Sequence, residues 1–303
     1  MSMRMGIIIR RMGLAAGYLL YTAVVLAVLL YVRFPDETVR LWIQNRINSS
    51  QHLVTCQIRK LRPTWTGGLN FSDIVLKAGN SQDLGLMKID SLRVRPQLLR
   101  WVSGTRAVQF AGKGHGGETH GTISLDQRKK RGRLTMRVQK VDIASFTDLL
   151  TLMRRKASGT LAGDFSLTAG ADLLTTATGD ADITVTNGVI GLQKELFGLG
   201  ELEFSSLTSK AKLADRMIRI LSGRLDSRVL SGKFGGELRL ASDPRLTTLL
   251  LKGTLSPRPE LFTKLKGKEE VDLMRGQLKD GKMPFTISGT VLEPGITFTD
   301  SGS

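Results

Sequence analysis

The chain has 303 residues, of which 41% are hydrophobic and only 6% aromatic, with 33 glycines and a formal net charge of +17. A chain of this length can bury a substantial core, and its aliphatic, glycine-rich composition favours repetitive β structure over an enzyme with a deep aromatic pocket. The positive charge is spread along the chain, and its one dense block has no aromatic neighbour on which a base could stack, so nucleic acid is not an expected partner. The single cysteine, Cys56, excludes an internal disulfide.

An uncharged stretch, residues 13–32, lies close to the amino terminus. At about 1.5 Å per helical residue it is about 30 Å long, which matches the hydrocarbon core of a bilayer. A cleaved signal peptide would have a shorter apolar core followed by small residues, whereas this stretch runs directly into Arg33. Tyr18 and Tyr31 lie near its ends, where aromatic rings favour the membrane interface. We therefore expect a retained transmembrane helix over 13–32, preceded by a short tail, 1–12.

The flanking residues add two expectations about this anchor. Gly13 and Gly17 form a G-x-x-x-G, which either lets two membrane helices approach as a homodimer or is a chance match. Beyond the anchor, Val39, Trp42 and further apolar residues recur at helical spacing, so the sequence predicts a juxtamembrane amphipathic helix over 33–50 that lies along the membrane. Arginine residues occur on both sides of the stretch and do not decide its orientation.

The hydrophobic period changes to two in the remainder of the chain, 51–303. Apolar and polar residues alternate in segments such as 74–78, 134–138 and 249–255, and this pattern predicts strands with one wet face and one apolar face. The residues after 50 are therefore expected to form one β-rich domain.

Two short helices are expected to interrupt the strands. One covers residues 145–153 with Ser145 as its cap, and the other follows Pro259. Both are expected to plug the open ends or the edge of a sheet.

An internal repeat is the most informative feature of the β-rich part. Residues 159–167 and 232–240 share the pattern G-x-φ-x-G-[DE]-φ-x-L, in which φ is apolar, and residues 117–125 share it loosely. The fixed glycine and apolar positions alternate, so they point to one face of a strand, and glycines on an apolar face are typical of places where a sheet bends. The apolar residues expected on this inner face are Leu161, Phe165, Leu167, Phe234, Leu238 and Leu240.

The dense basic block consists of Arg128, Lys129, Lys130 and Arg131, followed by Gly132 and Arg133. One interpretation is a solvated hairpin turn. The other is contact with anionic lipid headgroups, since basic side chains gain about 1 kcal/mol each near such a surface.

Two short motifs would suggest an enzyme but lack the required context. Residues 112–117 satisfy G-x-G-x-x-G, yet β-type segments flank them on both sides, without the helix that would bind a pyrophosphate. His115 and His120 flank Glu118, but residues five apart in a strand point to opposite faces, which disfavours a metal site. We therefore expect a non-enzymatic protein without a metal or a cofactor.

Three features together resemble the type II secretion system N proteins (GspN) and, more broadly, the AsmA-like envelope proteins. They are the apolar helix that ends at residues 32–35, the WTGGLNFSDIVL segment at 65–76, and the later G-x-L-x-G strands. The resemblance implies a single-pass inner-membrane protein of a diderm bacterium whose body lies in the periplasm, which makes residues 1–12 a cytoplasmic tail. It also implies an elongated, strongly curved antiparallel sheet with an apolar groove.

The resemblance implies two functions that do not exclude each other. The first is a non-enzymatic assembly or scaffold component of a type II secretion system, in contact with other secretion components. The alternative is a lipid-binding or lipid-transfer protein whose groove takes phospholipid or lipopolysaccharide. Self-association or curling of the sheet onto itself would close the groove instead, because a soluble monomer seldom exposes so large an apolar face.

Overall fold

The computed structural model describes residues 18, 21–22, 25, 28–29, 31–50, 54–65, 67–78, 85–98, 100, 104–126, 131–152, 156–170, 176–196, 198–241, 246–264, 278 and 280–298. The protein is mainly β, with one antiparallel sheet of 14 strands and a few short helices. The sequence prediction of an alternating, antiparallel β fold is confirmed.

The elements follow one another in chain order. The helices are α2 (Asp36–Ser50), the 3-10 turn η1 (Ile143–Ser145), α4 (Thr147–Leu152) and α6 (Pro259–Lys264). The first seven strands are β1 (Val54–Pro63), β2 (Leu69–Ala78), β3 (Gly85–Pro96), β4 (Thr105–Gly114), β5 (Gly117–Asp126), β6 (Arg131–Asp142) and β7 (Ala157–Ala169). The others are β8 (Thr178–Leu196), β9 (Leu199–Ala214), β10 (Met217–Asp226), β11 (Leu230–Arg239), β12 (Thr248–Pro257), β13 (Met283–Thr290) and β14 (Pro294–Phe298).

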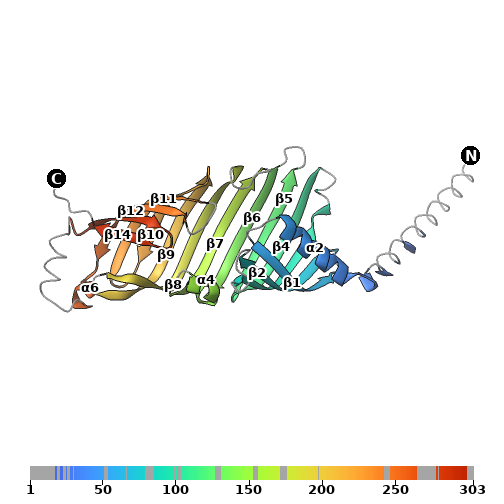
Figure 1. Cartoon of the computed structure of the whole chain (residues 1–303), viewed down its shortest axis with the longest axis horizontal. Helices are drawn as coiled ribbons and strands as arrows, with labels where there is room; N and C mark the ends of the chain where they lie inside the picture. Colours follow the sequence, from blue (N-terminus) through green and yellow to red (C-terminus); the bar gives the residue numbers. More distant parts are fainter. Residues whose placement is uncertain are drawn as a thin grey trace, which may run out of the picture.

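The sheet is a simple meander, in which every strand pairs with its neighbours in the sequence from β1 to β14. The strands stack along the long axis of the molecule, with α2 at one end and β14 at the other (Figure 1). At about 4.8 Å between strands, this arrangement makes the sheet about 60 Å long. Because the two outermost strands do not pair with each other, the sheet stays open.

One face of the sheet carries cross-strand rows of apolar residues, and we call it the apolar face. The rows arise because paired residues of neighbouring strands share a face. One continuous row follows the printed register through Val94, Phe110, Gly121, Met136, Phe165, Ala181, Ala211, Ile220, Gly236, Leu251 and Ile287. A second row runs through Val108, Ile123, Leu134, Leu167, Gly179, Leu213, Ile218, Leu238 and Leu249.

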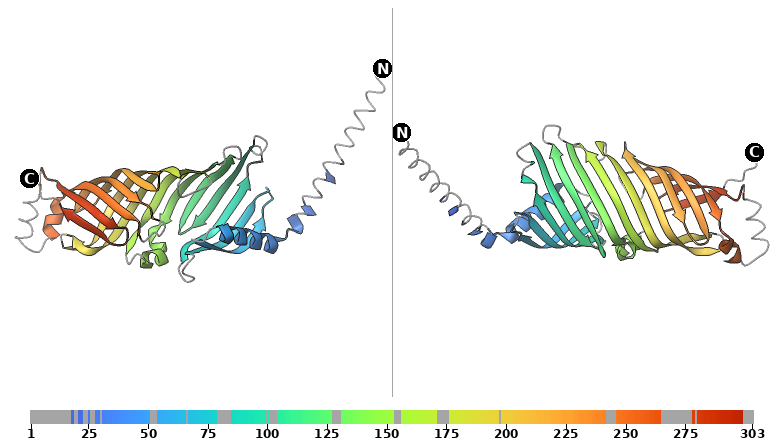
Figure 2. Two further views of the ribbon diagram at one scale, coloured as in Figure 1. Left: turned by 45° about the horizontal axis from the view of Figure 1, so that its top comes forward. Right: turned by 180° about the vertical axis from the view of Figure 1, so that it is seen from behind.

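The sheet curves so that the apolar face lies inside. Seen from behind, the central strands form a continuous wall, and the first and last strands curl away from the viewer (Figure 2). Bulges contribute to this curvature, because an extra residue in one strand bends it and increases its twist. In β6, Val138 and Val141 are both buried on the apolar face, while Gln139 and Lys140 between them are exposed, with Lys140 at φ 55°.

Glycines of the apolar face make room for phenylalanine rings on the paired strand. A Cβ atom on Gly121 would lie 2.3 Å from the ring of its partner Phe110, and one on Gly223 would lie 2.3 Å from the ring of Phe234. The repeat glycine Gly236 has φ 149°, and a Cβ there would lie 2.1 Å from the carbonyl oxygen of Leu250. The recurring glycines therefore permit close approach between strands, a role that differs from the bending role expected from the sequence.

The N-terminal end of the sheet has its own core. Ile58, Leu61 and Phe71 are buried there, and α2 adds Val39 and Ile43 from above the apolar face. A helix is therefore present over residues 36–50 of the predicted 33–50, and Val39 and Ile43 of its predicted apolar stripe pack on the sheet. Its predicted position along a membrane stays a prediction.

Polar side chains of α2 also cover the outer edge of β1. Arg40 Nη1 donates to the carbonyl oxygen of Ile58 (2.6 Å), whose N–H donates to Gln44 Oε1 (3.2 Å). Asn48 Nδ2 donates to the carbonyl oxygen of Cys56 (3.2 Å), and the Cys56 N–H donates to Asn48 Oδ1 (2.8 Å). Arg40, Gln44 and Asn48 lie four residues apart, on one side of the helix. Their side chains hydrogen-bond backbone groups at the edge of β1 that would otherwise be open to another strand. Burial in the same place raises the pKa of the Cys56 thiol.

The C-terminal end of the sheet has a second and larger core. Leu230, Leu261 and Met283 are almost completely inaccessible, with relative exposures of 1%, 0% and 1%. Leu261 comes from α6, which confirms the helix expected after Pro259 and its place at the end of the sheet. The two cores lie at opposite ends of the apolar face.

The other expected helix, at 145–153, is shorter and begins differently. Asp142 caps the 3-10 turn η1, where its side chain accepts from the Ala144 N–H, and α4 then starts at Thr147. The prediction of Ser145 as the helix cap is wrong, because Ser145 lies inside η1 and its hydroxyl donates to the Asp142 carbonyl oxygen.

Candidate functional site

The main candidate site is the central part of the apolar face, on β4 to β7, between the two cores. We call it the central apolar face and define it by its accessible large apolar residues, whereas Val138 and Val141 on the same face of β6 are buried. The accessible residues are Val108, Phe110, Ile123, Leu125, Leu134, Met136, Leu161, Phe165 and Leu167. Ile123 and Leu125 are 50% and 45% exposed, and the others are half-buried. Large aliphatic side chains on an inner face would normally be buried, so their accessibility marks this region as different from the two ends.

The size of the central apolar face suits a long hydrocarbon chain. Four strands and their flanks extend over roughly 20 Å at the usual strand spacing. One leaflet contributes about 15 Å to the hydrocarbon core of a bilayer. A single acyl chain would therefore fit along this part of the sheet.

The residues that the sequence predicted for an apolar groove divide into two groups. Leu161, Phe165 and Leu167 lie on β7 within the central apolar face, in register with apolar residues of β6. Leu238 lies on the same face of β11, but Phe234 packs against the C-terminal core. The last predicted residue, Leu240, follows β11, and its N–H donates to the Arg216 carbonyl oxygen (2.8 Å).

The predicted membrane-anchor residues are placed only in part. Gly13 and Gly17 lie outside the described residues. Tyr18 is helical and exposed, Trp42 is 67% exposed on α2, and Tyr31 stacks on the ring of Trp65 with 4.2 Å between ring centroids. In the part of the chain that the structure describes, no helix is long and apolar enough to cross a membrane.

The predicted headgroup contact is also only partly placed. Arg128, Lys129 and Lys130 lie outside the described residues, whereas Arg131 begins β6 and is exposed. The expectation for this block stays a prediction.

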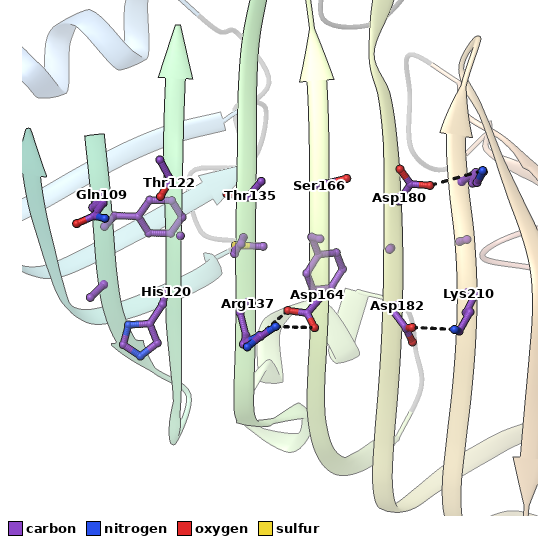
Figure 3. A pocket seen from close by; sticks show the side chains of 18 of the residues that line it. Gln109, His120, Thr122, Thr135, Arg137, Asp164, Ser166, Asp180, Asp182 and Lys210 are labelled. Atoms are coloured by element: carbon purple, nitrogen blue, oxygen red, sulfur yellow. Dashed lines mark hydrogen bonds and ion pairs between the residues drawn. The ribbon is translucent and has the colours of Figure 1, made fainter. Parts of the chain in front are cut away.

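A second candidate site lies on the opposite, polar face, and we call it the polar hollow. It has a volume of about 990 Å³, and six strands from β4 to β9 each line it with three consecutive residues. The middle residue of each triplet belongs to the apolar row, so the two outer residues point to the polar face. Figure 3 shows these side chains as two ranks, with Gln109, Thr122, Thr135, Ser166 and Asp180 in one, and His120, Arg137, Asp164, Asp182 and Lys210 in the other.

Most charged side chains in the polar hollow form ion pairs with one another. Arg137 Nε donates to Asp164 Oδ1 (2.6 Å), and this pair raises the pKa of the arginine. Lys210 Nζ lies 3.4 Å from Asp182 Oδ2, and Lys212 Nζ lies 3.9 Å from Asp180 Oδ1. The sequence signal for this arrangement is D-x-D in β8 and K-x-K in β9, which alternation alone identifies only as residues of a wet face and which pair only once the strand register is known.

The histidine motif forms a structural turn. His115 lies between β4 and β5 with φ 53°, and its ring stacks on Phe146 at 4.1 Å. Its Nδ1 atom is 2.7 Å from Ser145 Oγ, and its Nε2 atom accepts from the Lys88 N–H (3.1 Å). Both ring nitrogens are therefore engaged in holding β3, the hairpin and η1 together. The described residues contain no group of three or more His, Cys, Asp or Glu side chains that could hold a metal ion.

Comparison of the chain with known protein families, with curated proteins and with solved structures finds no match. The interpretation of the site therefore depends on the geometry of the sheet.

Proposed function

We propose that this protein is a non-enzymatic, membrane-anchored protein whose central apolar face binds the acyl chains of lipids. One observation carries the proposal. The apolar rows continue across the sheet, and cores cover them at both ends, yet Ile123 and Leu125 in the centre are about half exposed. An acyl chain is the ligand that this surface fits best, because it is apolar, narrow and long.

The energetics support an acyl chain over a polar ligand. Each buried methylene contributes about 0.8 kcal/mol, so a chain that loses much of its contact with water along the sheet can bind without any directional contact. Arg137 and Asp164 stand on the opposite face and pair with each other, whereas the charged residue Arg106 lies on the apolar face beside Leu125, near the end of β4. A headgroup would therefore remain in water at the rim while the chain lies on the sheet.

The resemblance to the type II secretion N proteins supports a cellular setting for this activity. In that setting the helix over 13–32 anchors the protein in the inner membrane and the body lies in the periplasm. A reporter that is active only outside the cytoplasm, fused after Ser303, should then be active. A mature chain that begins near residue 30 would contradict the anchor.

An assembly or scaffold role in the secretion system is the second candidate. The polar hollow favours it, because exposed charged pairs on the outer face can exchange partners with another protein. The two roles can be separated by measuring secretion in cells whose protein carries a substitution on the central apolar face that abolishes lipid binding. A pure scaffold would still support secretion, whereas a lipid carrier would not.

The direct test uses charges on the two faces of one strand. Leu167→Glu places a carboxylate on the central apolar face, and Thr168→Glu places one on the polar face beside Arg133. A carboxylate on the apolar face stays hydrated while that face is empty but must be desolvated beneath an acyl chain, at a cost of several kcal/mol. We expect Leu167→Glu and Leu238→Glu to fold, by circular dichroism, and to lose the lipids that mass spectrometry detects in the wild-type protein.

Thr168→Glu is the matched control and should retain those lipids. Unfolding of both apolar-face variants would contradict the proposal, because it would mean that these residues lie in a closed core. Retention of the full lipid content by Leu167→Glu would also contradict it.

A further inference from the structure

The turn between β1 and β2 presents an exposed tryptophan on a rigid support. Trp65 is 75% exposed, although hydrogen bonds hold the turn on both sides of it. The Thr64 N–H donates to the Gly68 carbonyl oxygen (2.8 Å), the Gly67 N–H to the Thr64 carbonyl oxygen (3.0 Å) and the Gly68 N–H to Thr64 Oγ1 (3.0 Å). Gly67 takes the φ of 74° that this turn requires. The turn thus holds a large apolar ring in solvent.

This tryptophan lies beside Tyr31, the penultimate residue of the uncharged stretch. The rings of Trp65 and Tyr31 stack with an interplanar angle of 26°. Tyr31 is the last aromatic residue of the stretch 13–32, whose length matches the hydrocarbon core of a bilayer. Trp and Tyr side chains concentrate at the membrane interface, where one part of the ring system is apolar and the other wet.

The outer side of α2 presents a second apolar pair. Leu41 and Trp42 are 43% and 67% exposed, while Val39 and Ile43 on the other side of the helix contact the sheet. A helix on the surface of a water-soluble domain normally carries polar side chains on its outer side. An exposed Leu-Trp pair next to the end of an apolar stretch indicates contact with lipid.

The charges near the turn are complementary to an anionic bilayer. Arg62 precedes the turn, Arg93 lies in the same cross-strand row through Asn70, and all three of Arg62, Arg93 and Arg95 are exposed. A Cβ atom on Gly68 would lie 3.0 Å from Arg95 Cγ, so the stem of Arg95 lies against the turn. Arginine side chains beside exposed aromatic rings are typical of segments that lie in the headgroup layer.

We propose that the β1–β2 turn and the outer side of α2 dock into the interfacial layer of an anionic bilayer, with Trp65 and Trp42 as the two inserted side chains. The N-terminal end of the sheet is then held against the membrane surface, and the apolar face begins where the bilayer ends. This docking surface does not depend on lipid binding by the central apolar face, so each proposal can fail without the other.

The test measures fluorescence quenching in the full-length chain, reconstituted in vesicles of phosphatidylethanolamine and phosphatidylglycerol that contain brominated phosphatidylcholine. The variant with Trp42→Phe and Trp101→Phe keeps Trp65 as its only tryptophan. Bromine close to the headgroup should quench Trp65 about twofold more than bromine deep in the acyl chains, because an interfacial ring contacts the upper part of the chains. In the corresponding variant that keeps only Trp42, bromine close to the headgroup should likewise quench the fluorescence more than bromine deep in the acyl chains.

The control introduces Leu246→Trp into a chain without the three native tryptophans. Leu246 is 64% exposed and lies just before β12, away from α2, so its replacement should be quenched by aqueous iodide and not by bromolipid. The proposal is overturned if Trp65, like this control, is quenched by aqueous iodide and not by bromolipid. It is overturned equally if deep bromine quenches Trp65 more strongly than shallow bromine, because the ring would then lie in hydrocarbon.

Discussion

The C-terminal end of the sheet and its centre have the same alternating sequence pattern but differ in what covers their apolar face. At the end, α6 inserts Leu261, and Leu261 and Met283 are 0% and 1% exposed. In the centre, Ile123 and Leu125 are 50% and 45% exposed. Alternation therefore decides which side chains share a face, whereas a separate element decides whether that face becomes a core.

The largest expected effect on the free energy of unfolding comes from the C-terminal core, and it is compared with a substitution in the exposed central apolar face. Leu261→Ala should lower the free energy of unfolding by about 2–5 kcal/mol, since it removes buried methylenes and leaves a cavity. Ile123→Ala should cost less than about 1 kcal/mol, because half of that side chain is already in water. Urea denaturation of the two variants measures both values, and equal losses would contradict the difference between the regions.

The second prediction concerns the glycine and phenylalanine pairs. Gly121→Ala should cost about 1–3 kcal/mol, because its Cβ atom would overlap the Phe110 ring and force the strands apart. Gly132→Ala, on the same face with its nearest contact at 4.0 Å, is the control and should be nearly neutral. Thermal unfolding compares them, and combining Gly121→Ala with Phe110→Leu should recover part of the loss. A similar loss in both single variants would show that ring packing is not the reason for the glycine.

A third, smaller effect is expected at the covered edge of β1. Asn48→Ala removes both hydrogen bonds to the Cys56 backbone and should cost about 1–3 kcal/mol, because the N–H and carbonyl groups lose their partner. Asn45→Ala, on the exposed side of α2, should have little effect. Chemical denaturation provides the comparison, and hydrogen exchange at Cys56 should become faster only in Asn48→Ala.

The smallest effect is expected on the polar face. Lys210→Gln removes one member of an exposed ion pair with Asp182 and should change stability by less than about 1 kcal/mol. Thermal unfolding with and without added salt measures this change. A loss as large as that of Leu261→Ala would mean that the charged ladder, and not the cores, holds the sheet together.

Much of the fold could be predicted from the sequence, because apolar alternation over 134–138 or 249–255 needs only local information. The helix after Pro259 was predictable for the same reason. The bulges are harder to predict, although Val138 and Val141 show the signal as apolar residues three apart with two exposed residues between them. Whether such spacing is a bulge or a strand end depends on the neighbouring strand, which a single local segment does not specify.

The candidate site was predictable only in part. The repeat placed Phe165 and Leu167 on the correct face, but the same pattern in β11 gave no reason to separate Phe234, which packs into the C-terminal core. That difference arises from α6, a distant segment that covers one end of the face. The role of Trp65 could not be predicted from the sequence, because its stacking on Tyr31 depends on a contact across more than thirty positions of the chain.

The central claim is that the apolar face is open to lipid in the centre of the sheet. Photo-crosslinking from an unnatural amino acid at Ile123, with Thr122 on the opposite face as the adjacent control, tests this claim most directly. We expect the probe at Ile123 to form lipid adducts, detected by mass spectrometry of the purified protein, and the probe at Thr122 to form none. Equal yields of lipid adduct at both positions, or protein adducts alone at Ile123, would contradict the claim.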